Sequence, residues 1–514
     1  MREITKLTER KYGSILCILI VGAALRLYRL TDRSLWIDEI YSISIRGTEP
    51  ASEIFLSSTL DSHPPLHYVV LHYWMEVFGN SVVATRIQAV IIGMAGILSL
   101  YLLGAELFDS RVGLIAASLL AVSPMHVNAS RTVRMYGLLS LLAILSTYFF
   151  VLTARNYSYR SVGGYAISTI LLLWTHPYAV FVVVAHNVYV VTVFVSNGEP
   201  RRLSFSWPRW SMSQVLIALW AFPGVARMLE LAVGLSTGAT GGLVSWMPDA
   251  NRYHLIETLL YYAGLPSYYP YIVDATGIRL VAVIVALVAI VCIGVAFGEY
   301  GRQGSNRSWS SGQVDGLYLL SLLVGSAIVL PFVISKILRP VYHINSTIVG
   351  VFAFFLIVAL GASKLPTGSV RTLCVVVLIG GLFVSSGFYL SASSIEPWND
   401  AATHVESDAT EGDLVVFNPQ WIDTSYTYYA GGTKYETTGI SENFSPREAD
   451  ELRTQVEDRD RVWVVSRFTP NLDRVTETVG ESHTVQSYDQ YGELRVYLFV
   501  ETGSDDTEAD DTSD

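Results

Sequence analysis

Residues 278–297, IRLVAVIVALVAIVCIGVAF, contain one charged side chain and no proline. About 20 consecutive apolar residues in an α-helix suffice to cross the hydrocarbon core of a membrane, which is roughly 30 Å thick. Further apolar runs occur at residues 12–25, 136–152, 349–362 and 373–390. The pattern therefore predicts an α-helical protein that crosses a membrane several times.

The composition of the chain agrees with this interpretation. Of its 514 residues, 51% are hydrophobic and 15% are charged, and the mean hydropathy is +0.40. These values exclude a soluble enzyme of this length. The first apolar run follows basic residues, as in a signal sequence, but residues 26–36 offer no small-residue cleavage site. We therefore expect a retained membrane anchor.

Charge is divided unevenly along the chain. Residues 391–514 contain 27 acidic and eight basic residues, whereas residues 1–390 contain 18 acidic and 26 basic residues. We expect the acidic end, residues 503–514, to be a disordered tail. An acidic surface with five lysines in the whole chain fits a high-salt organism such as a haloarchaeon. It excludes nucleic-acid binding, which requires a basic face.

Basic residues in short loops favour the cytoplasmic side of a membrane. The basic stretches are the N-terminus and residues 154–160, 199–210, 300–309 and 363–371. Placing all five inside predicts about 11 spans in a transmembrane domain of residues 1–391, with residues 31–64 as an external loop. Residues 63–79 are short and polar for a span, so we expect them to lie in the membrane interface.

Residues 392–502 have the pattern of a small α/β domain, which the odd number of spans places outside the cell. Strand-like apolar runs occur at residues 412–418, 460–468 and 493–501. Residues 445–458, SPREADELRTQVED, combine helical spacing with the Ser-x-x-Glu start of a capped helix. No catalytic motif stands out in this domain.

In this predicted membrane topology, polar residues that are costly in lipid collect at the external face. Asp38 and Glu39 come just after the first span, in the stretch SLWIDEIYS. The others are His63, Arg131, Arg134, Tyr136, His176, Arg339, Tyr342 and His343. A carboxylate can accept a proton from a hydroxyl nucleophile. Arginine and histidine can bind a phosphate and stabilise its charge as it leaves.

These residue types suggest an enzyme whose donor resides in the lipid. A sugar on a polyprenyl phosphate fits, because its apolar tail would lie among the helices while its phosphate meets the cations at the surface. The three cysteines lie within apolar runs, so we expect neither a disulfide framework nor a cysteine metal site.

Each of these residues also has a structural alternative. Asp38 and Glu39 can begin an interfacial helix, where acids favour the N-terminal end of the helix dipole. Arg131 and Arg134 can extend to lipid head groups. A hydrogen-bonded core histidine and a loop charge are the corresponding interpretations of His176 and Arg339. The gathering of all these residues on one face favours the functional interpretation.

Four stretches, taken in order, resemble the GT-C superfamily of membrane glycosyltransferases, in particular its dolichyl-phosphate-mannose protein mannosyltransferases. They are SLWIDEIYS at residues 34–42, SHPPLHYVVLHYW at 62–74, LLAVSPMHVNASRTVRMYGLLSLLAILS at 119–146 and WTHPYAVFVVVAHN at 174–187. The similarity covers residues 12–200 well and residues 240–390 loosely.

The resemblance implies that Asp38 is the catalytic base, with Glu39 beside it. It also implies a group that binds the donor phosphate and lipid, for which the candidates are Arg134, Tyr136, His63, His176, Arg339 and His343. Thr132 stands where the family commonly has a glutamate, so no metal or other cofactor is expected to be required, because hard cations prefer carboxylate oxygens.

A second departure from the family lies before a late helix. Asn345 and Ser346 replace an Arg-Tyr pair, which leaves Arg339 or His343 as the substitute cation. This replacement points to an altered donor or acceptor pocket, or to reduced activity.

The implied reaction moves a single sugar, expected to be mannose, from dolichyl phosphate to a hydroxyl of a glycan or glycoprotein outside the cell. Surface-layer protein N-glycosylation would fit a haloarchaeal host. Three alternatives stay open. An oligosaccharyltransferase would be expected to carry a Trp-Trp-Asp-Tyr-Gly signature, and a lipid-linked sugar flippase to carry inverted repeats. A non-catalytic membrane scaffold would tolerate replacement of Asp38 by asparagine.

Overall fold

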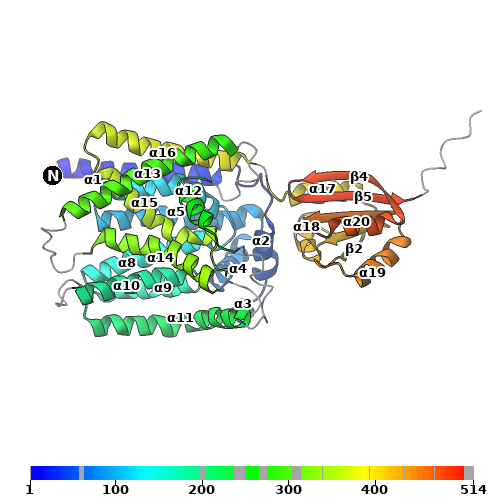
Figure 1. The fold of residues 1–514 in the computed structure, drawn as a ribbon, viewed down its shortest axis with the longest axis horizontal. Coiled ribbons are helices and arrows are strands. Elements are labelled where there is room, and N and C mark those ends of the chain that lie inside the picture. The colour runs from blue at the N-terminus through cyan, green and yellow to red at the C-terminus, as the bar shows by residue number, and fades with distance from the viewer. Residues whose placement is uncertain are drawn as a thin grey trace, which may run out of the picture. The chain divides into compact units, whose positions relative to one another are not determined.

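The computed structural model describes residues 2–56, 63–196, 203–236, 249–265, 275–303, 314–338, 340–392, 394–432, 434–467 and 469–502. The chain forms two compact units, and Figure 1 labels many of their elements. The membrane unit comprises Met1–Leu30 and Glu49–Ala392, and the sheet unit comprises Thr31–Thr48 and Ser393–Asp514. Residues 31–48, here called the acid loop because they include Asp38 and Glu39, therefore belong to the sheet unit.

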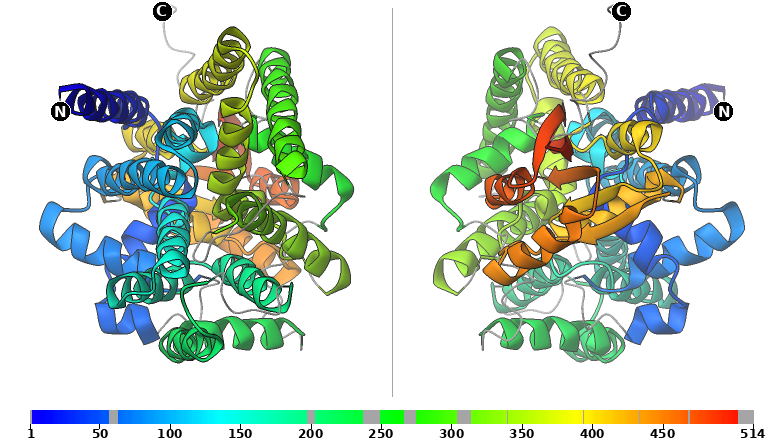
Figure 2. Two further views of the ribbon diagram at one scale, coloured as in Figure 1. Left: turned by 90° about the vertical axis from the view of Figure 1, so that its left-hand side faces the viewer. Right: turned by 90° about the vertical axis from the view of Figure 1, so that its right-hand side faces the viewer.

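Helices make up the membrane unit within the described ranges, and Figure 2 views the longer ones from their two ends. They are α1 (Arg2–Leu27), α3 (Ala51–Leu56), α4 (Leu66–Phe78), α5 (Val82–Leu107), α6 (Ser110–Val122), α7 (Pro124–Ala129), α8 (Tyr136–Arg155), α9 (Tyr159–Leu173), α10 (Ala179–Ser196), α11 (Trp207–Ser236), α12 (Arg252–Tyr262), α13 (Ala275–Gln303), α14 (Gly316–Ile337), the 3₁₀ turn η5 (Ile344–Thr347), α15 (Ile348–Ser363) and α16 (Gly368–Ser391).

The predicted class of a multi-pass α-helical membrane protein is confirmed. Among the described residues, six helices are long and apolar enough to cross a membrane, namely α5, α8, α13, α14, α15 with η5, and α16. Shorter apolar helices occur within α1, α6 and α10. The number of crossings stays a prediction. Residues 63–79 form α4, whose 13 residues are shorter than the roughly 20 that a span needs.

Glycines allow helices of the membrane unit to pack closely. A Cβ atom on Gly361 of α15 would lie 1.7 Å from the carbonyl oxygen of Cys292 in α13. One on Gly104 of α5 would lie 2.7 Å from the Cα atom of Gly113 in α6. Small residues are what membrane helices use for close approach. α15 is almost wholly buried, whereas α13 and α16 expose much of their apolar surface, as lipid-facing helices do.

The sheet unit contains a five-stranded sheet of order β2-β1-β3-β5-β4. β1 (Leu414–Asn418) pairs in parallel with β2 (Glu436–Gly439) and β3 (Arg461–Arg467). β5 (Leu494–Glu501) is antiparallel to β3 and to β4 (His483–Tyr491). Parallel neighbours need crossover connections, and the helices between β1 and β3 supply them. These are the 3₁₀ turn η6 (Gln420–Ile422), α18 (Asp423–Ala430) and α19 (Pro446–Glu457). α17 (Trp398–Asp408) precedes β1, and α20 (Leu472–Gly480) connects β3 to β4.

The three strands and the helix predicted from the sequence are confirmed as β1, β3, β5 and α19. Apolar side chains from β1, β3, α19 and α20 form one buried core, which includes Val416, Val464, Leu452 and Val475. The acid loop adds the short helix α2 (Ile37–Ile40), which continues as the π-helical segment η1 (Tyr41–Arg46). The loop packs on α18 of the same unit.

Helix α19 begins with the predicted capping box. The backbone N–H of Ser445 donates to the Glu448 carboxylate over 2.7 Å, and the Ser445 hydroxyl accepts from the N–H of Glu448 over 3.3 Å. Hydrogen bonds from Ser441 and Ser445 lower the pKa of Glu448 to about 2. Because this folded-state pKa lies below the ordinary one, the stabilisation is present above the ordinary pKa and is lost as pH falls toward 2.

We predict that Glu448→Gln lowers the melting temperature at pH 7 by the equivalent of the ~1 kcal/mol that a helix cap contributes. The difference from wild type should shrink as the pH falls from about 4 toward about 2. Thermal unfolding followed by circular dichroism measures both effects. Glu451→Gln is the matched control. It also removes one negative charge, in this case from the exposed ion pair with Arg447, and it should change the melting temperature little. Equal effects of the two substitutions would contradict the prediction.

Candidate active site

The beginnings of several helices bring predicted site residues together in the membrane unit. His63 precedes α4, Tyr136 begins α8, His176 lies between α9 and α10, and His343 precedes η5. The His176 ring centroid lies 5.2 Å from that of His63 and 5.9 Å from that of Tyr136. Tyr136 lies 6.3 Å from His343. We call this group, with Arg134 and Ser346, the histidine cluster.

Backbone hydrogen bonds fix the segments that carry the histidines. The N–H of Leu66, at the start of α4, donates to the carbonyl oxygen of Trp174 over 3.0 Å. The Tyr178 hydroxyl donates to the carbonyl oxygen of Val341 over 3.0 Å and accepts from the N–H of His343 over 2.9 Å. The turn at residues 174–178 is therefore tied to the approaches of both α4 and η5.

A chain of hydrogen bonds connects two histidines of the cluster. Nδ1 of His176 accepts from the backbone N–H of Tyr178 over 3.1 Å, which assigns the ring proton to Nε2. Nε2 lies 3.4 Å from the Ser346 hydroxyl, which lies 3.2 Å from Nδ1 of His343. When the hydroxyl donates onward to Nδ1 of His343, the Nε2 atom of that ring carries a proton.

The electrostatics of the cluster favour this neutral His176. Burial lowers the pKa of His176 well below its ordinary value, and the nearby His63, His343 and Arg134 act in the same direction. Both ring nitrogens of His176 already engage protein groups. His176 therefore orients Ser346 and His343, and its effect on a bound anion would act through them.

Arg134 adds a permanent positive charge to the cluster. It is 7% exposed, and its Nη1 lies 3.4 Å from the hydroxyl of the buried Tyr68 in α4. An arginine guanidinium is always protonated and presents a planar fork of donors, which suits phosphate oxygens. The cluster thus combines N–H and O–H donors with a fixed cation among apolar helices, which is an arrangement that can hold an anion.

Arg131, three residues earlier, has a different role that sequence analysis missed. Its guanidinium donates over 2.6–3.0 Å to carbonyl oxygens at the end of α1, those of Leu25, Arg26, Tyr28 and Arg29. The last carbonyls of a helix have no partner within the helix. Arg131 supplies their donors, so it neither extends to lipid head groups nor belongs to the histidine cluster.

Arg26 and His126 form a second polar pair that the sequence did not single out. Arg26 is fully buried, and it donates to Nδ1 of His126 over 2.7 Å and to the carbonyl oxygens of Gly22 and Ala121 over 2.8 and 2.9 Å. The pair ties α1 to α6 and α7. The sequence signal for this pair was the position of Arg26, a basic residue in the last turn of an apolar helix.

Asp38 and Glu39 lie in the first turn of α2, in the sheet unit. Asp38 is half-buried and Glu39 is 3% exposed. The Glu39 carboxylate accepts from the backbone N–H of Trp36 over 3.3 Å, so it has a structural role in starting the helix. Arg339 lies outside the described residues. Within the described ranges, no three histidine, cysteine or acidic side chains cluster as they would to hold a metal ion.

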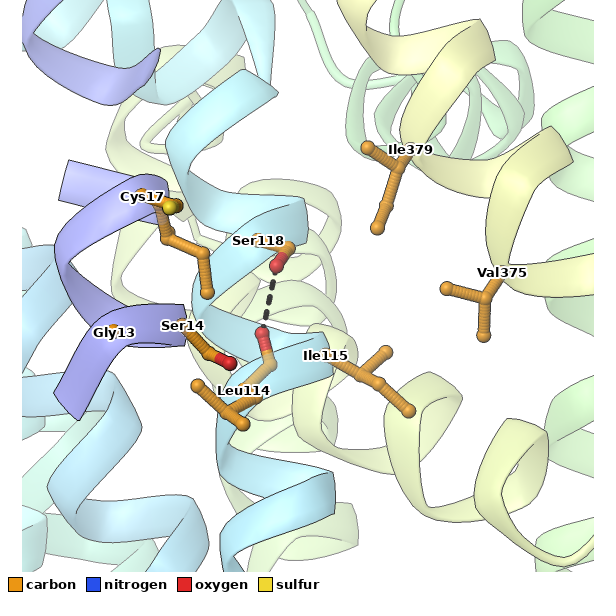
Figure 3. A pocket seen from close by; sticks show the side chains of 9 residues that line it. Gly13, Ser14, Cys17, Leu114, Ile115, Ser118, Val375 and Ile379 are labelled. Atoms are coloured by element: carbon orange, nitrogen blue, oxygen red, sulfur yellow. Dashed lines mark hydrogen bonds between the residues drawn. The ribbon is translucent and has the colours of Figure 1, made fainter. Parts of the chain in front are cut away.

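A pocket of about 550 Å³ lies between α1, α6 and α16 of the membrane unit (Figure 3). Its lining is mostly apolar and comes from Gly13, Ser14, Cys17, Ile18, Leu114, Ile115, Ser118, Val375 and Ile379. The Ser118 hydroxyl donates to the carbonyl oxygen of Leu114 over 2.8 Å, so its polarity is satisfied within its own helix. None of the predicted site residues lines this pocket.

Comparison with known proteins relates this geometry to a family. A family model described as dolichyl-phosphate-mannose-protein mannosyltransferase matches residues 62–224, a range that includes His63, Arg134, Tyr136 and His176. No curated protein matches the chain.

Solved structures share the fold. An Archaeoglobus fulgidus oligosaccharyltransferase tethered to an acceptor peptide is 12% identical, with 95% of this chain and 74% of that chain covered and a TM-score of 0.55. The same coverage and identity hold for the A. fulgidus oligosaccharyltransferase AglB with an inhibitory peptide and a dolichol-phosphate, at a TM-score of 0.50. These solved structures share the fold of this chain, and the family model matches residues 62–224 of it.

A third GT-C structure that matches is ArnT from Cupriavidus metallidurans in the apo state. It is 13% identical, with 95% of this chain and 98% of that chain covered and a TM-score of 0.45. The family model and the shared fold of the A. fulgidus structures confirm the resemblance to the GT-C superfamily that the four sequence stretches predicted.

Arg131 and Arg134 give a paired prediction. Arg131→Lys should lower the melting temperature of the detergent-purified protein, because a single ammonium cannot replace the guanidinium at four carbonyls. Arg134→Lys should leave the melting temperature within about 2 °C of wild type and weaken binding of a phosphate-bearing ligand. Thermal unfolding and binding of dolichyl phosphate measure the two effects. If Arg134→Lys lowered the melting temperature and Arg131→Lys did not, the distinction between the two arginines would be overturned.

Proposed function

We propose that this GT-C protein is a glycosyltransferase that moves a single sugar from a dolichyl or polyprenyl phosphate to a hydroxyl of a glycan or glycoprotein on the outer face of the membrane. The observation that carries the proposal is the histidine cluster. It gathers a buried guanidinium, hydroxyl groups and histidine N–H donors at one place in a unit of apolar helices.

Both parts of a lipid-linked phosphate, the charged phosphate and the apolar isoprenoid tail, suit this cluster. The phosphate is an anion that accepts hydrogen bonds from Arg134, Tyr136 and the Nε2 proton of His343, and His63 completes the group. The isoprenoid tail is apolar and is solvated by helices and lipid. His176 acts indirectly, by orienting Ser346 and His343.

Asp38 is the proposed base of the reaction. Its carboxylate takes the proton of the acceptor hydroxyl as that oxygen forms a bond to the anomeric carbon of the sugar. The bond from the anomeric carbon to the phosphate oxygen breaks, and the electron pair leaves with the lipid phosphate, whose charge Arg134 and His343 stabilise. Attack opposite the leaving group inverts the anomeric carbon.

Mannose is the proposed sugar, and the family model that covers His63, Arg134, Tyr136 and His176 supports it by its description. The acidic sheet unit and the scarcity of lysine support a haloarchaeal host, in which surface-layer protein N-glycosylation is a suitable process. An oligosaccharyltransferase is the second candidate, because the A. fulgidus structures with the same fold are of that kind. The sequence contains no Trp-Trp-Asp-Tyr-Gly stretch.

The test is sugar transfer from synthetic dolichyl-phosphate-mannose in membranes that carry wild-type or variant protein, with the product mass measured on the glycoproteins of the source cells. We predict that Asp38→Asn lowers transfer by about 10²- to 10⁴-fold, which is the contribution of a general base. Asp32→Asn is the matched control, since this exposed acid lies in the same loop, and it should keep transfer near wild type.

The outcomes separate the candidate functions. A mass increase of one hexose supports the proposal, whereas addition of a preassembled oligosaccharide favours the oligosaccharyltransferase. Movement of the lipid-linked sugar across vesicles without a covalent product favours a flippase. Wild-type transfer by Asp38→Asn protein would remove Asp38 as the base and leave the acids with their structural role at the helix start.

A further inference from the structure

The acid loop is held in the sheet unit by hydrogen bonds to its backbone. The N–H of Leu35 donates to the Tyr429 hydroxyl over 2.7 Å, and the N–H of Ile37 donates to Oε2 of Glu396 over 3.0 Å. Ser34 contacts Asn399, whose N–H donates to the Ser34 hydroxyl over 3.2 Å. Three contact points, at residues 34, 35 and 37, therefore lie shortly before Asp38 in the sequence.

Glu396 is the unusual member of this set, because it is a buried carboxylate. It is 2% exposed. Its Oε2 accepts from the N–H of Ile37 and from Nε1 of Trp398, each over 3.0 Å, and its Oε1 pairs with Nη2 of Arg467 over 2.7 Å. Burying a charge is costly unless it is paired and hydrogen-bonded. A residue that satisfies this requirement so fully has a fixed position.

The backbone around Glu396 is fixed as well. The carbonyl oxygen of Ile395 accepts from the N–H of Glu493 over 3.0 Å, at the β4–β5 turn. Gly492 in that turn has a φ of +56°, and a Cβ atom there would lie 2.3 Å from the same carbonyl oxygen. A side chain at residue 492 would therefore displace the segment that carries Glu396. Arg467, on β3, also pairs with Glu493 over 3.5 Å, which ties the carboxylate to the sheet.

The start of α2 is thus held from two sides. Glu396 holds the N–H of Ile37, and the Glu39 carboxylate of the loop itself holds the N–H of Trp36. Asp38 directly follows these two anchored positions. Its backbone carbonyl accepts from the Ser42 hydroxyl over 2.7 Å, so its place in the helical turn is set on both sides.

We propose that Glu396 is a positioning residue that holds the acid loop on the sheet unit and thereby sets the position of the Asp38 carboxylate for proton abstraction. The inference rests on the proposed function insofar as Asp38 is the base. Glu396 itself touches neither donor nor acceptor in this proposal. It acts through the backbone of Ile37, and the sheet unit becomes part of the catalytic apparatus.

The deciding variant is Glu396→Gln, which keeps the size of the side chain. A carboxylate offers two acceptor oxygens to Ile37, Trp398 and Arg467, whereas an amide offers one oxygen and brings two donors. Glu493→Gln is the matched control. It weakens the ion pair between Arg467 and residue 493. It leaves the hydrogen bond from Ile37 to Glu396 in place.

Hydrogen exchange measured by mass spectrometry on the full-length protein gives a readout that needs no activity. We predict that Glu396→Gln raises the exchange rate of peptides covering residues 35–40 about tenfold or more, while Glu493→Gln leaves it near wild type. In the transfer assay, kcat should fall by about 10- to 100-fold, because small displacements of a reacting group are costly. The KM for dolichyl-phosphate-mannose should change less than twofold.

Each outcome has a distinct meaning. Unchanged exchange at residues 35–40 in Glu396→Gln would overturn the proposal. So would wild-type kcat in that variant while Asp38→Asn is inactive. Raised exchange in Glu396→Gln together with wild-type transfer by Asp38→Asn would support the proposal that Glu396 holds the acid loop. It would refute the proposed role of Asp38. If Glu396→Gln does not fold, Tyr429→Phe decides, because it removes one acceptor from the loop at Leu35 and should raise exchange and lower kcat in the same way.

Discussion

The guanidinium of Arg131 closes the carbonyl end of α1, and the arrangement of the membrane unit around the histidine cluster depends on this closure. Inside a membrane protein, unpaired backbone carbonyls are costly, so a helix that ends within the bundle requires a donor from elsewhere in the chain. Arg131 is this donor, and it fixes where the chain leaves α1 for the acid loop. The turn that carries Arg131 leads directly into Arg134 and α8. One interaction therefore joins the end of α1 to the turn that leads into the histidine cluster.

The departures from the family pattern acquire a physical meaning in this structure. Ser346 replaces a tyrosine of the family and lies between His176 and His343, where its hydroxyl can relay a hydrogen bond. Asn345 replaces an arginine and accepts from the hydroxyl of Tyr261 over 2.9 Å. Both side chains contribute to the local network. Neither side chain carries a positive charge, so the permanent charge of the histidine cluster comes from Arg134.

Much of this architecture could be predicted from local sequence patterns. Apolar runs predicted the membrane helices, and continuous apolar runs predicted β1, β3 and β5. β2 and β4 were not predicted, because ETTG and HTVQSYDQY lack an apolar run, and β4 is an edge strand with mostly exposed side chains. The grouping of His63, Arg134, Tyr136, His176 and His343 followed from the resemblance and the threading.

The role of Glu396 could not be predicted in this way. Nothing in the residues around it resembles a motif, and its partners Ile37 and Arg467 lie far away in the sequence. Every residue except proline has a backbone N–H, so the residue types do not indicate this hydrogen bond. Only the three-dimensional structure reveals it. The same is true of Arg131, because its acceptors are also backbone atoms.

The division of the sheet unit between two distant stretches of chain has a consequence for biosynthesis. The acid loop leaves the ribosome about 350 residues before Glu396 does, which at ordinary elongation rates is roughly 20–70 s. Throughout that interval the membrane helices can insert, but the surface on which the loop packs has not been made. Completion of the sheet unit is therefore the last step in assembling Asp38 in its folded surroundings. Through this order of synthesis, the proposed base reaches its folded position only after the membrane helices have been made.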